Sequence, residues 1–172
     1  MTIHKLIESN HPTLSIPLDK VSDGCDRKQL KEDLIETMKD LNGMGLSANQ
    51  VGIMERAFVM YDNFEKRETA ACFNPKIIHE SEEQIIMEEG CLSYPGLYVA
   101  IERAYGVSTR FQLSQGEEQS GNFIELSARI FQHESEHMDG EIFIDNVSGF
   151  RLKAAMRKRK KYLRQLKKQK KG

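Results

Sequence analysis

Apolar residues recur at helical spacing near the start of this 172-residue chain. The repeat follows Asp26 and comprises Leu30, Leu34, Ile35, Met38 and Leu41. This spacing predicts an amphipathic helix, with Asp26 as its N-cap and Gly43 as its terminator. The first 22 residues contain Pro12 and Pro17 and lack a regular pattern, so we expect them to be irregular.

The pattern changes to short apolar runs rich in Val, Ile, Phe and Tyr, which are typical of strands. The predicted strands are Ala57–Tyr61, Ala71–Ile78, Gln84–Met87 and Tyr98–Leu113. The following stretch, Gln115–Gly121, is polar and contains two glycines, so it is predicted to be a loop.

Two further helices are expected in the last third of the chain. One begins near Asn122, ends at Gly140, and carries Phe123, Leu126, Ile130, His133 and His137 on one broad face. The other begins near Phe150 and has a narrow apolar stripe formed by Leu152, Met156, Leu163 and Leu166.

The order of elements predicts an α+β fold. We expect a single compact domain over residues 1–172, with short, mostly antiparallel strands packed around a central helix that carries the histidines. An N-terminal helix and a basic C-terminal helix, residues 151–172, complete the expected fold.

Composition narrows the class of protein. Apolar residues make up 39% and charged residues 30%, and no apolar run is long enough to cross a membrane. The first residues show neither a signal peptide nor an acid-free transit peptide, so a cytoplasmic location is expected. An odd, sparse set of three cysteines predicts reduced thiols, and we expect structural roles for Cys25 and Cys72.

The net charge of −1 conceals a strong asymmetry. Residues 151–171 contain 12 Lys or Arg and no acid, which leaves 13 basic and 26 acidic residues, or −13, for the rest. A basic helix of this kind indicates either contact with a polyanion, such as ribosomal RNA, or a solvated face.

The most specific motif is His133-Glu134-Ser135-Glu136-His137. Side chains four positions apart lie on one helix face, so both imidazoles can bind one metal ion. Glu134 follows the first ligand directly and is the expected general base.

Catalytic metal sites usually have three protein ligands, so one more is needed. The candidates are the cysteines, the carboxylates and His4, His11 and His79. Cys91 stands out because it follows a predicted strand in Glu89-Gly90-Cys91-Leu92-Ser93, where Gly90 permits close backbone approach. Its thiolate suits zinc or ferrous iron, although a lone cysteine is more often a small buried apolar residue.

Three segments together resemble the motifs of peptide deformylases. They are Gly43-Met44-Gly45-Leu46-Ser47-Ala48-Asn49-Gln50, Glu89-Gly90-Cys91-Leu92-Ser93 and Gln132-His133-Glu134-Ser135-Glu136-His137. The resemblance implies a metal-dependent hydrolase that removes the formyl group from the initiator methionine of nascent polypeptides and releases formate. It also supports contact of the basic helix with the ribosome.

The resemblance also implies roles for particular residues. Cys91, His133 and His137 would be the ligands of one divalent metal ion, with Fe2+ the usual physiological metal and Zn2+, Ni2+ or Co2+ able to replace it. Gln50 and the backbone N–H of Leu92 would donate hydrogen bonds to the developing oxyanion.

The substrate would be an N-formylmethionyl peptide. Its extended backbone is expected to lie along Gly43, Gly45 and Gly90. The apolar residues Met87, Leu126 and Ile130 are candidates for the methionine pocket, with a plain core role as the alternative.

The chain departs from the motifs at a few positions. Ser47 stands where alanine is usual, Glu136 where aspartate is usual, and Met138 where leucine is common. Ser47 adds a hydroxyl near the site, and the longer Glu136 is expected to change a hydrogen bond behind the metal ligands.

The sequence leaves two alternative functions and the placement of Arg129 open. An HExxH zinc endopeptidase would share both histidines and Glu134 but would give Cys91 no role. A ribosome- or RNA-binding module would use a closed structural metal site. Arg129, four residues before His133, could face solvent, pair with Glu125 or lie at the rim of the substrate cleft.

Overall fold

The computed structural model describes residues 1–63, 65–145 and 147–169, and for residues 166–169 only the backbone. The helices are η1 (Pro12–Ser15), α1 (Arg27–Asp40), η2 (Ala48–Val51), α2 (Glu125–Met138) and α3 (Gly149–Gln169). The strands are β1 (Gly45–Ser47), β2 (Ala57–Asn63), β3 (Glu68–Glu80), β4 (Gln84–Gly90), β5 (Tyr98–Ala104), β6 (Gly106–Gln112) and β7 (Glu118–Ile124). The side chain of Leu166 and residues 170–172 of the predicted basic helix lie outside the described residues.

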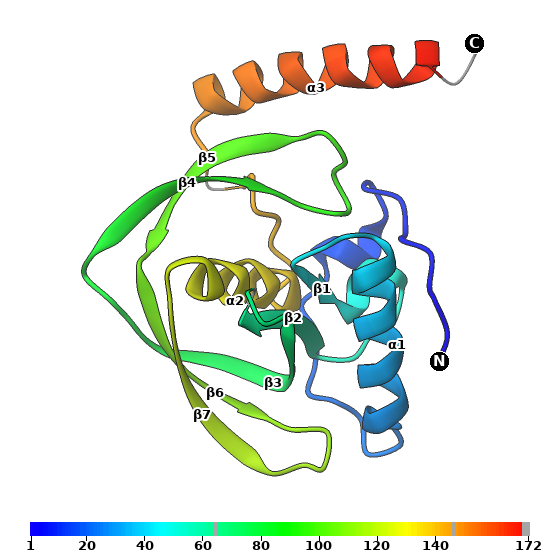
Figure 1. Ribbon diagram of the computed structural model, residues 1–172, viewed down its shortest axis with the longest axis vertical. Helices are drawn as coiled ribbons and strands as arrows, with labels where there is room; N and C mark the ends of the chain where they lie inside the picture. Colours follow the sequence, from blue (N-terminus) through cyan, green and yellow to red (C-terminus); the bar gives the residue numbers. More distant parts are fainter. Residues whose placement is uncertain (64, 146, 170–172) are drawn as a thin grey trace.

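The strands form two antiparallel sheets. One has five strands in the order β1-β2-β3-β6-β7, and the other is the β4-β5 hairpin. Figure 1 shows α2 at the centre with the strands around it, α1 beside β1 and β2, and α3 extending along the far side of the hairpin. The predicted α+β fold with antiparallel strands is confirmed.

Strand β2 is buried on both faces, because a helix covers each side of it. Phe58 and Met60 belong to the apolar cluster around α2, whereas Val59 belongs to the cluster around α1. This division follows from the two-residue period of a strand, whose successive side chains point to opposite faces. The same period explains why the sequence of β2 is a continuous apolar run rather than an alternating one.

The predicted first helix is largely correct. Asp26 is its N-cap, and its carboxylate accepts a hydrogen bond from the backbone N–H of Gln29. The helix ends at Asp40, however, and Asn42 rather than Gly43 takes the left-handed conformation after it, with φ 53°. Asparagine adopts this conformation more easily than most residues, so the expected glycine terminator was wrong.

Two expectations in the second half of the chain were also wrong. The predicted strand Tyr98–Leu113 is divided between β5 and β6, which belong to different sheets. The predicted loop Gln115–Gly121 contains most of β7, so α2 begins at Glu125 rather than near Asn122. Because β7 is an edge strand with largely exposed polar side chains, its sequence lacks the apolar alternation that identifies a strand.

Helix α3 packs against the loop that connects β4 to β5. Ala155 is buried in an apolar cluster with Cys91, Tyr94, Leu97, Val99 and Phe143. Tyr162 lies directly over Gly96, where an added Cβ would overlap the ring. In the part of the chain that the structure describes, every helix is too short or too polar to cross a lipid bilayer.

The turn after α2 generates a stability prediction. Gly140 has φ +74°, and a Cβ built there would lie 2.8 Å from the backbone N of Pro17. We expect Gly140→Ala to lower the free energy of unfolding by about 1–3 kcal/mol, because alanine adds both backbone strain and a clash with rigid backbone. Urea denaturation measures this change. Gly24→Ala is the matched control, since a Cβ there meets nothing within 4 Å; equal stability of the two variants would contradict the prediction.

Candidate metal centre and active site

The fold brings Cys91, His133 and His137 together from two elements. The histidines lie one turn apart on α2, and Cys91 follows the last residue of β4. One ligand atom from each residue lies within 4.8 Å of the other two, and Cys91 Sγ is 3.3 Å from His137 Nε2. Both imidazoles are buried. The sequence predicted this set, and the structure places its members close enough to share one ion.

The donor set fits a divalent transition metal. One sulfur and two imidazole nitrogens are the ligands that zinc and ferrous iron accept. Burial and the neighbouring His133 lower the pKa of His137 to about 3, which keeps His137 in the neutral form that binds a metal. His133 Nδ1 lies 2.6 Å from Glu89 Oε1, so its other ring nitrogen is left for the ion.

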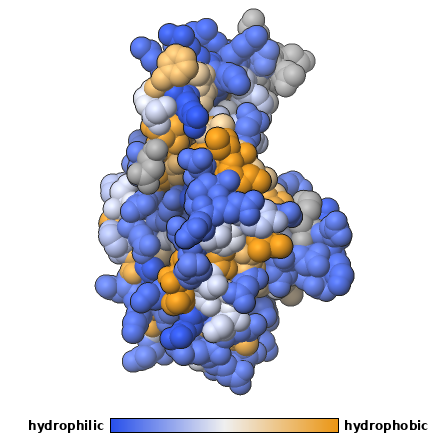
Figure 2. Space-filling model, turned by 90° about the vertical axis from the view of Figure 1, so that its left-hand side faces the viewer, coloured by the Kyte–Doolittle hydropathy of each residue, from blue (hydrophilic) through white to orange (hydrophobic). Residues whose placement is uncertain are grey.

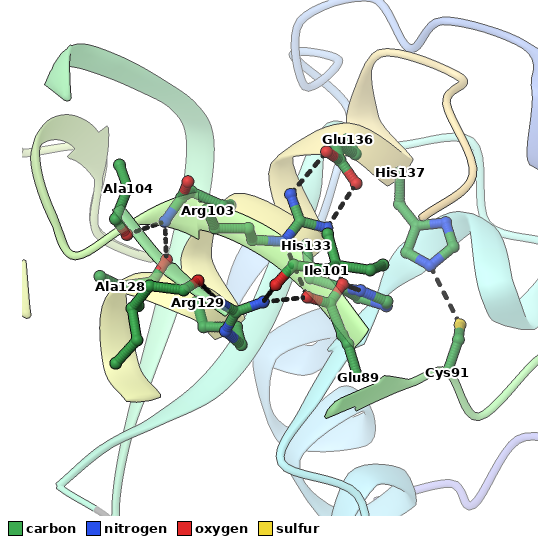
Figure 3. A network of polar contacts seen from close by, with 12 residues as sticks. Glu89, Cys91, Ile101, Arg103, Ala104, Ala128, Arg129, His133, Glu136 and His137 are labelled. Atoms are coloured by element: carbon green, nitrogen blue, oxygen red, sulfur yellow. Dashed lines mark hydrogen bonds and ion pairs between the residues drawn. The ribbon is translucent and has the colours of Figure 1, made fainter. Parts of the chain in front are cut away.

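Glu89 lies behind His133 in a buried network of charged side chains (Figure 3). Arg103 donates to both Glu89 oxygens, from Nη2 to Oε1 at 2.6 Å and from Nε to Oε2 at 2.7 Å. The same guanidinium binds both oxygens of Glu136, at 2.6 and 2.8 Å. Arg103 therefore connects the carboxylate behind His133 to a carboxylate on the following turn of α2.

Electrostatics keep this network ionised. Burial by itself raises the pKa of Glu89, but the hydrogen bonds and charges of Arg103 and His133 outweigh burial and hold that pKa well below its usual range. The carboxylates of Glu89 and Glu136 in turn raise the pKa of Arg103, against the effect of burial. The lowered pKa favours the ionised form of Glu89, which can accept the Nδ1–H of His133.

The structure decides among the three placements left open for Arg129. The residue is buried, and its Nη1 donates to Glu89 Oε2 at 2.9 Å. It also donates to the backbone carbonyls of Ile85 in β4 and Ile101 in β5. It lines the wall of the cavity described below but is not paired with Glu125. Arg129 therefore fixes the β4-β5 hairpin to α2.

Glu134 is buried beside the predicted ligands. Burial raises its pKa, while the charge of His133 and a hydrogen bond from Ser47 act in the opposite direction. Ser47 Oγ donates to Glu134 Oε2, and the Ser47 N–H donates to Gln50 Oε1 at 2.9 Å. Gln50 Nε2 lies 3.3 Å from Cys91 Sγ. A raised pKa is suited to a carboxylate that takes up and returns a proton near neutral pH.

A cavity of about 210 Å³ opens beside these residues. Its wall includes the predicted residues Gly43, Gly45, Gln50, Gly90, Cys91, Leu92, Leu126, Ile130, His133 and Glu134. Met87 is not among the residues that line this cavity, so the cavity gives its expected contact with methionine no support. The residues of β4 that line the cavity are Glu88, Glu89 and Gly90 at the end of the strand.

The glycines in the wall permit close approach of neighbouring groups. A Cβ at Gly45 would overlap Glu134 Oε1 and lie 2.8 Å from Ile130 Cγ2. A Cβ at Gly43 would lie 2.7 Å from Leu92 Cδ1, and one at Gly90 would lie 2.7 Å from the Tyr98 ring. Any larger residue at these positions would fill space between the cavity and the catalytic side chains.

Sequence reasoning missed part of the site. Glu89 was noted only as part of a motif, and Arg103, Tyr98 and Glu88 were not singled out. Arg129 carried a usable signal, because a residue four positions before His133 lies on the same helix face. Arg103 carried none, since its partners lie 14 and 33 residues away in the chain.

One protein family recurs in comparisons of this chain with known proteins. The family model described as "Polypeptide deformylase" matches residues 3–153. A peptide deformylase of Pseudothermotoga lettingae is 41% identical over 136 residues, which cover 79% of this chain and 77% of the relative. The solved structure of a peptide deformylase from Legionella pneumophila has a TM-score of 0.86 and 31% identity, covering 96% of this chain and 98% of that one. A Synechococcus elongatus peptide deformylase in complex with actinonin has a TM-score of 0.84 and 31% identity, covering 90% and 86%.

The buried network generates the second prediction. We expect Arg103→Gln to lower the free energy of unfolding by about 3–5 kcal/mol, because Glu89 and Glu136 would lose their shared cation inside the protein. Urea denaturation of the metal-free protein at neutral pH measures this change. Lys39→Gln is the control, because Lys39 forms an exposed pair with Glu36 and should contribute less than about 1 kcal/mol. A loss as small as that of the control would contradict the prediction.

Proposed function

Because this chain belongs to the peptide deformylase family, we propose that Cys91, His133 and His137 hold its metal ion and that Glu134 transfers the proton. The chain is a metal-dependent hydrolase that removes the N-formyl group from nascent peptides. The observation that carries the residue assignment is the convergence of one thiol and two imidazoles at the side of a cavity whose wall includes Cys91, His133 and Glu134.

We propose Fe2+ as the physiological metal, with Zn2+, Ni2+ and Co2+ able to occupy the same site. The mixed sulfur and nitrogen donor set supports a metal from this group over Mg2+ or Ca2+, which prefer oxygen ligands. A bound divalent cation would supply Lewis acidity, which lowers the pKa of water at the site and polarises a carbonyl group.

The side chains would divide the remaining work of amide hydrolysis among them. Glu134 accepts a proton from the attacking water and later returns it to the departing amine. Gln50 and the backbone N–H of Leu92 donate hydrogen bonds to the formyl oxygen as negative charge develops on it. Loss of one such donor typically lowers turnover by about 10²–10³. The cavity position of Gln50 and Leu92 supports these roles.

The cavity also supports a mode of substrate binding. Gly43, Gly45 and Gly90 leave room for an extended peptide backbone along the wall. Leu126 and Ile130 form the apolar part of the wall, and we propose that they contact the methionine side chain. Met87 receives no such role because it does not line the cavity.

We further propose that residues 1–172 constitute one catalytic domain that acts in the cytoplasm. Support for one domain comes from the family match over residues 3–153 and from α3, which packs against the loop that carries Cys91. Support for the location comes from the substrate, since nascent peptides emerge from the ribosome, and from the free thiols of Cys25, Cys72 and Cys91.

The basic helix α3 is proposed to bind the ribosome. In Figure 2 the end of the molecule that carries α3 is mostly hydrophilic, and hydrophobic side chains gather where this end meets the body. In the described part of α3, Ala155, Arg159 and Tyr162 contact the body. Lys and Arg dominate its sequence, so the remaining surface offers a positive charge to RNA phosphates.

The reaction itself is tested by formate release. Protein that has been loaded with Fe2+ in the absence of oxygen is expected to release formate from a formyl-Met tripeptide. It should release no acetate from the acetyl-Met tripeptide. Glu134→Gln should lower turnover by about 10²–10⁴ with metal content unchanged, because it removes the proton acceptor but no ligand. Cys91→Ala should lose metal. Retained metal and activity in Cys91→Ala, together with peptide-bond cleavage, would favour an HExxH endopeptidase instead.

The ribosome contact is tested by cosedimentation at several salt concentrations. A chain that ends at residue 156 keeps Ala155 in its cluster but loses ten of the twelve basic residues of the helix. It should bind ribosomes much more weakly than the full chain, whose affinity should fall steeply with salt. Equal binding by both chains would contradict a role for α3, and unchanged formate release would show that the shorter chain is folded.

A further inference from the structure

Ser47 is a buried hydroxyl residue at the junction of β1 and η2. Its exposed fraction is 0%, and it pairs with Phe58 at the end of β1. Leu46, the preceding residue, belongs to the apolar cluster around α1. Because successive strand residues point to opposite faces, the side chain of Ser47 is directed toward α2, where Glu134 lies.

Ser47 contacts both polar side chains assigned to the reaction. Its hydroxyl donates to Glu134 Oε2, and its backbone N–H donates to Gln50 Oε1 at 2.9 Å. A backbone N–H can only donate, so the carbonyl oxygen of the Gln50 amide must face Ser47. The amide nitrogen is therefore directed to the other side, where it lies 3.3 Å from Cys91 Sγ and 3.1 Å from Ser93 Oγ.

The two oxygens of Glu134 have different surroundings. Oε2 accepts the Ser47 hydrogen bond, whereas Oε1 lies against Gly45, a residue of the cavity wall. Gly45 has no side chain, so it leaves Oε1 next to the cavity. The hydroxyl thus fixes the rotation of the carboxylate, with one oxygen held behind the wall and the other toward the substrate space.

We propose that Ser47 is a positioning residue for deformylation, which holds Glu134 with Oε1 toward the reacting groups and Gln50 with Nε2 toward them. This inference rests on the proposed function, because it gives Ser47 a role only through Glu134 and Gln50. The contact with the Gln50 side chain uses the Ser47 backbone and would survive substitution, whereas the contact with Glu134 requires the hydroxyl. A charge-assisted hydrogen bond to a buried carboxylate helps to fix its rotamer, together with packing.

The first test compares Ser47→Ala with the unsubstituted chain, both loaded with the same metal. Alanine is the usual residue at this place in the motif, so the variant should fold. We expect kcat for formate release to fall on the order of tenfold, a part of the 10²–10⁴ that a positioned base contributes, with KM and metal content unchanged. Ser127→Ala is the control, because it removes a hydroxyl of α2 that donates to the Asp62 carbonyl and not to Glu134.

The second test asks whether the effect passes through Glu134. Glu134→Asp shortens the side chain by one methylene and withdraws the carboxylate from the hydroxyl. Ser47→Ala should therefore lower kcat by a much smaller factor in the Glu134→Asp background than in the otherwise unsubstituted chain. Ser47→Thr keeps a hydroxyl, so it should retain a higher kcat than Ser47→Cys. A structural role would lower kcat by the same factor in both backgrounds.

The outcomes separate this inference from the proposed function. An active unsubstituted chain with wild-type kcat in Ser47→Ala would overturn the role of Ser47 and leave deformylation intact. Equal losses in both Glu134 backgrounds, or loss of metal in Ser47→Ala, would overturn it as well. An unsubstituted chain that binds metal but releases no formate would refute the proposed function itself.

Discussion

Glu89 belongs to β4, yet its carboxylate accepts hydrogen bonds from Arg103 on β5 and from Arg129 and His133 on α2. Isolated burial of a carboxylate costs several kcal/mol, so this group stays ionised only because two guanidinium groups and an imidazole surround it. The position of the hairpin relative to α2 therefore depends on the same charge that orients His133. A change in the position of the hairpin would therefore also change the orientation of His133.

This dependence explains how a small site acquires a fixed geometry. Cys91 follows Glu89 by two residues, so the carboxylate that orients His133 also limits where the thiol can lie. Arg129 binds backbone carbonyls of both hairpin strands, which prevents the hairpin from moving away from the helix. The three proposed ligands thus come from two segments that are joined directly behind the site, as metal sites require for precise ligand placement.

The opposite wall of the site comes from β1, an edge strand of the five-stranded sheet, and from η2, the short helix that follows it. Ser47 and Gln50 reach Glu134 and Cys91 from this side, and glycines keep the intervening space open. Phe131 on α2 packs against Phe58 on β2, and this contact sets the distance between α2 and the five-stranded sheet. The groups proposed to act in the reaction therefore approach the cavity from both sheets, while α2, which carries two of the proposed ligands, lies between them (Figure 1).

Sequence alone determined the features that depend on residues close in the chain. The order of the helical and strand-like patterns predicted the α+β class, and Asp26 predicted the start of α1. The three motifs predicted the reaction, and they are the basis for proposing Cys91, His133 and His137 as the ligands. Only the tertiary structure decided that Arg103 binds Glu89 and Glu136, that β7 is an edge strand, that Met87 lies outside the cavity and that Ser47 contacts Glu134. Each of these depends on which distant segments pack together, and local period and propensity carry no information about such pairings.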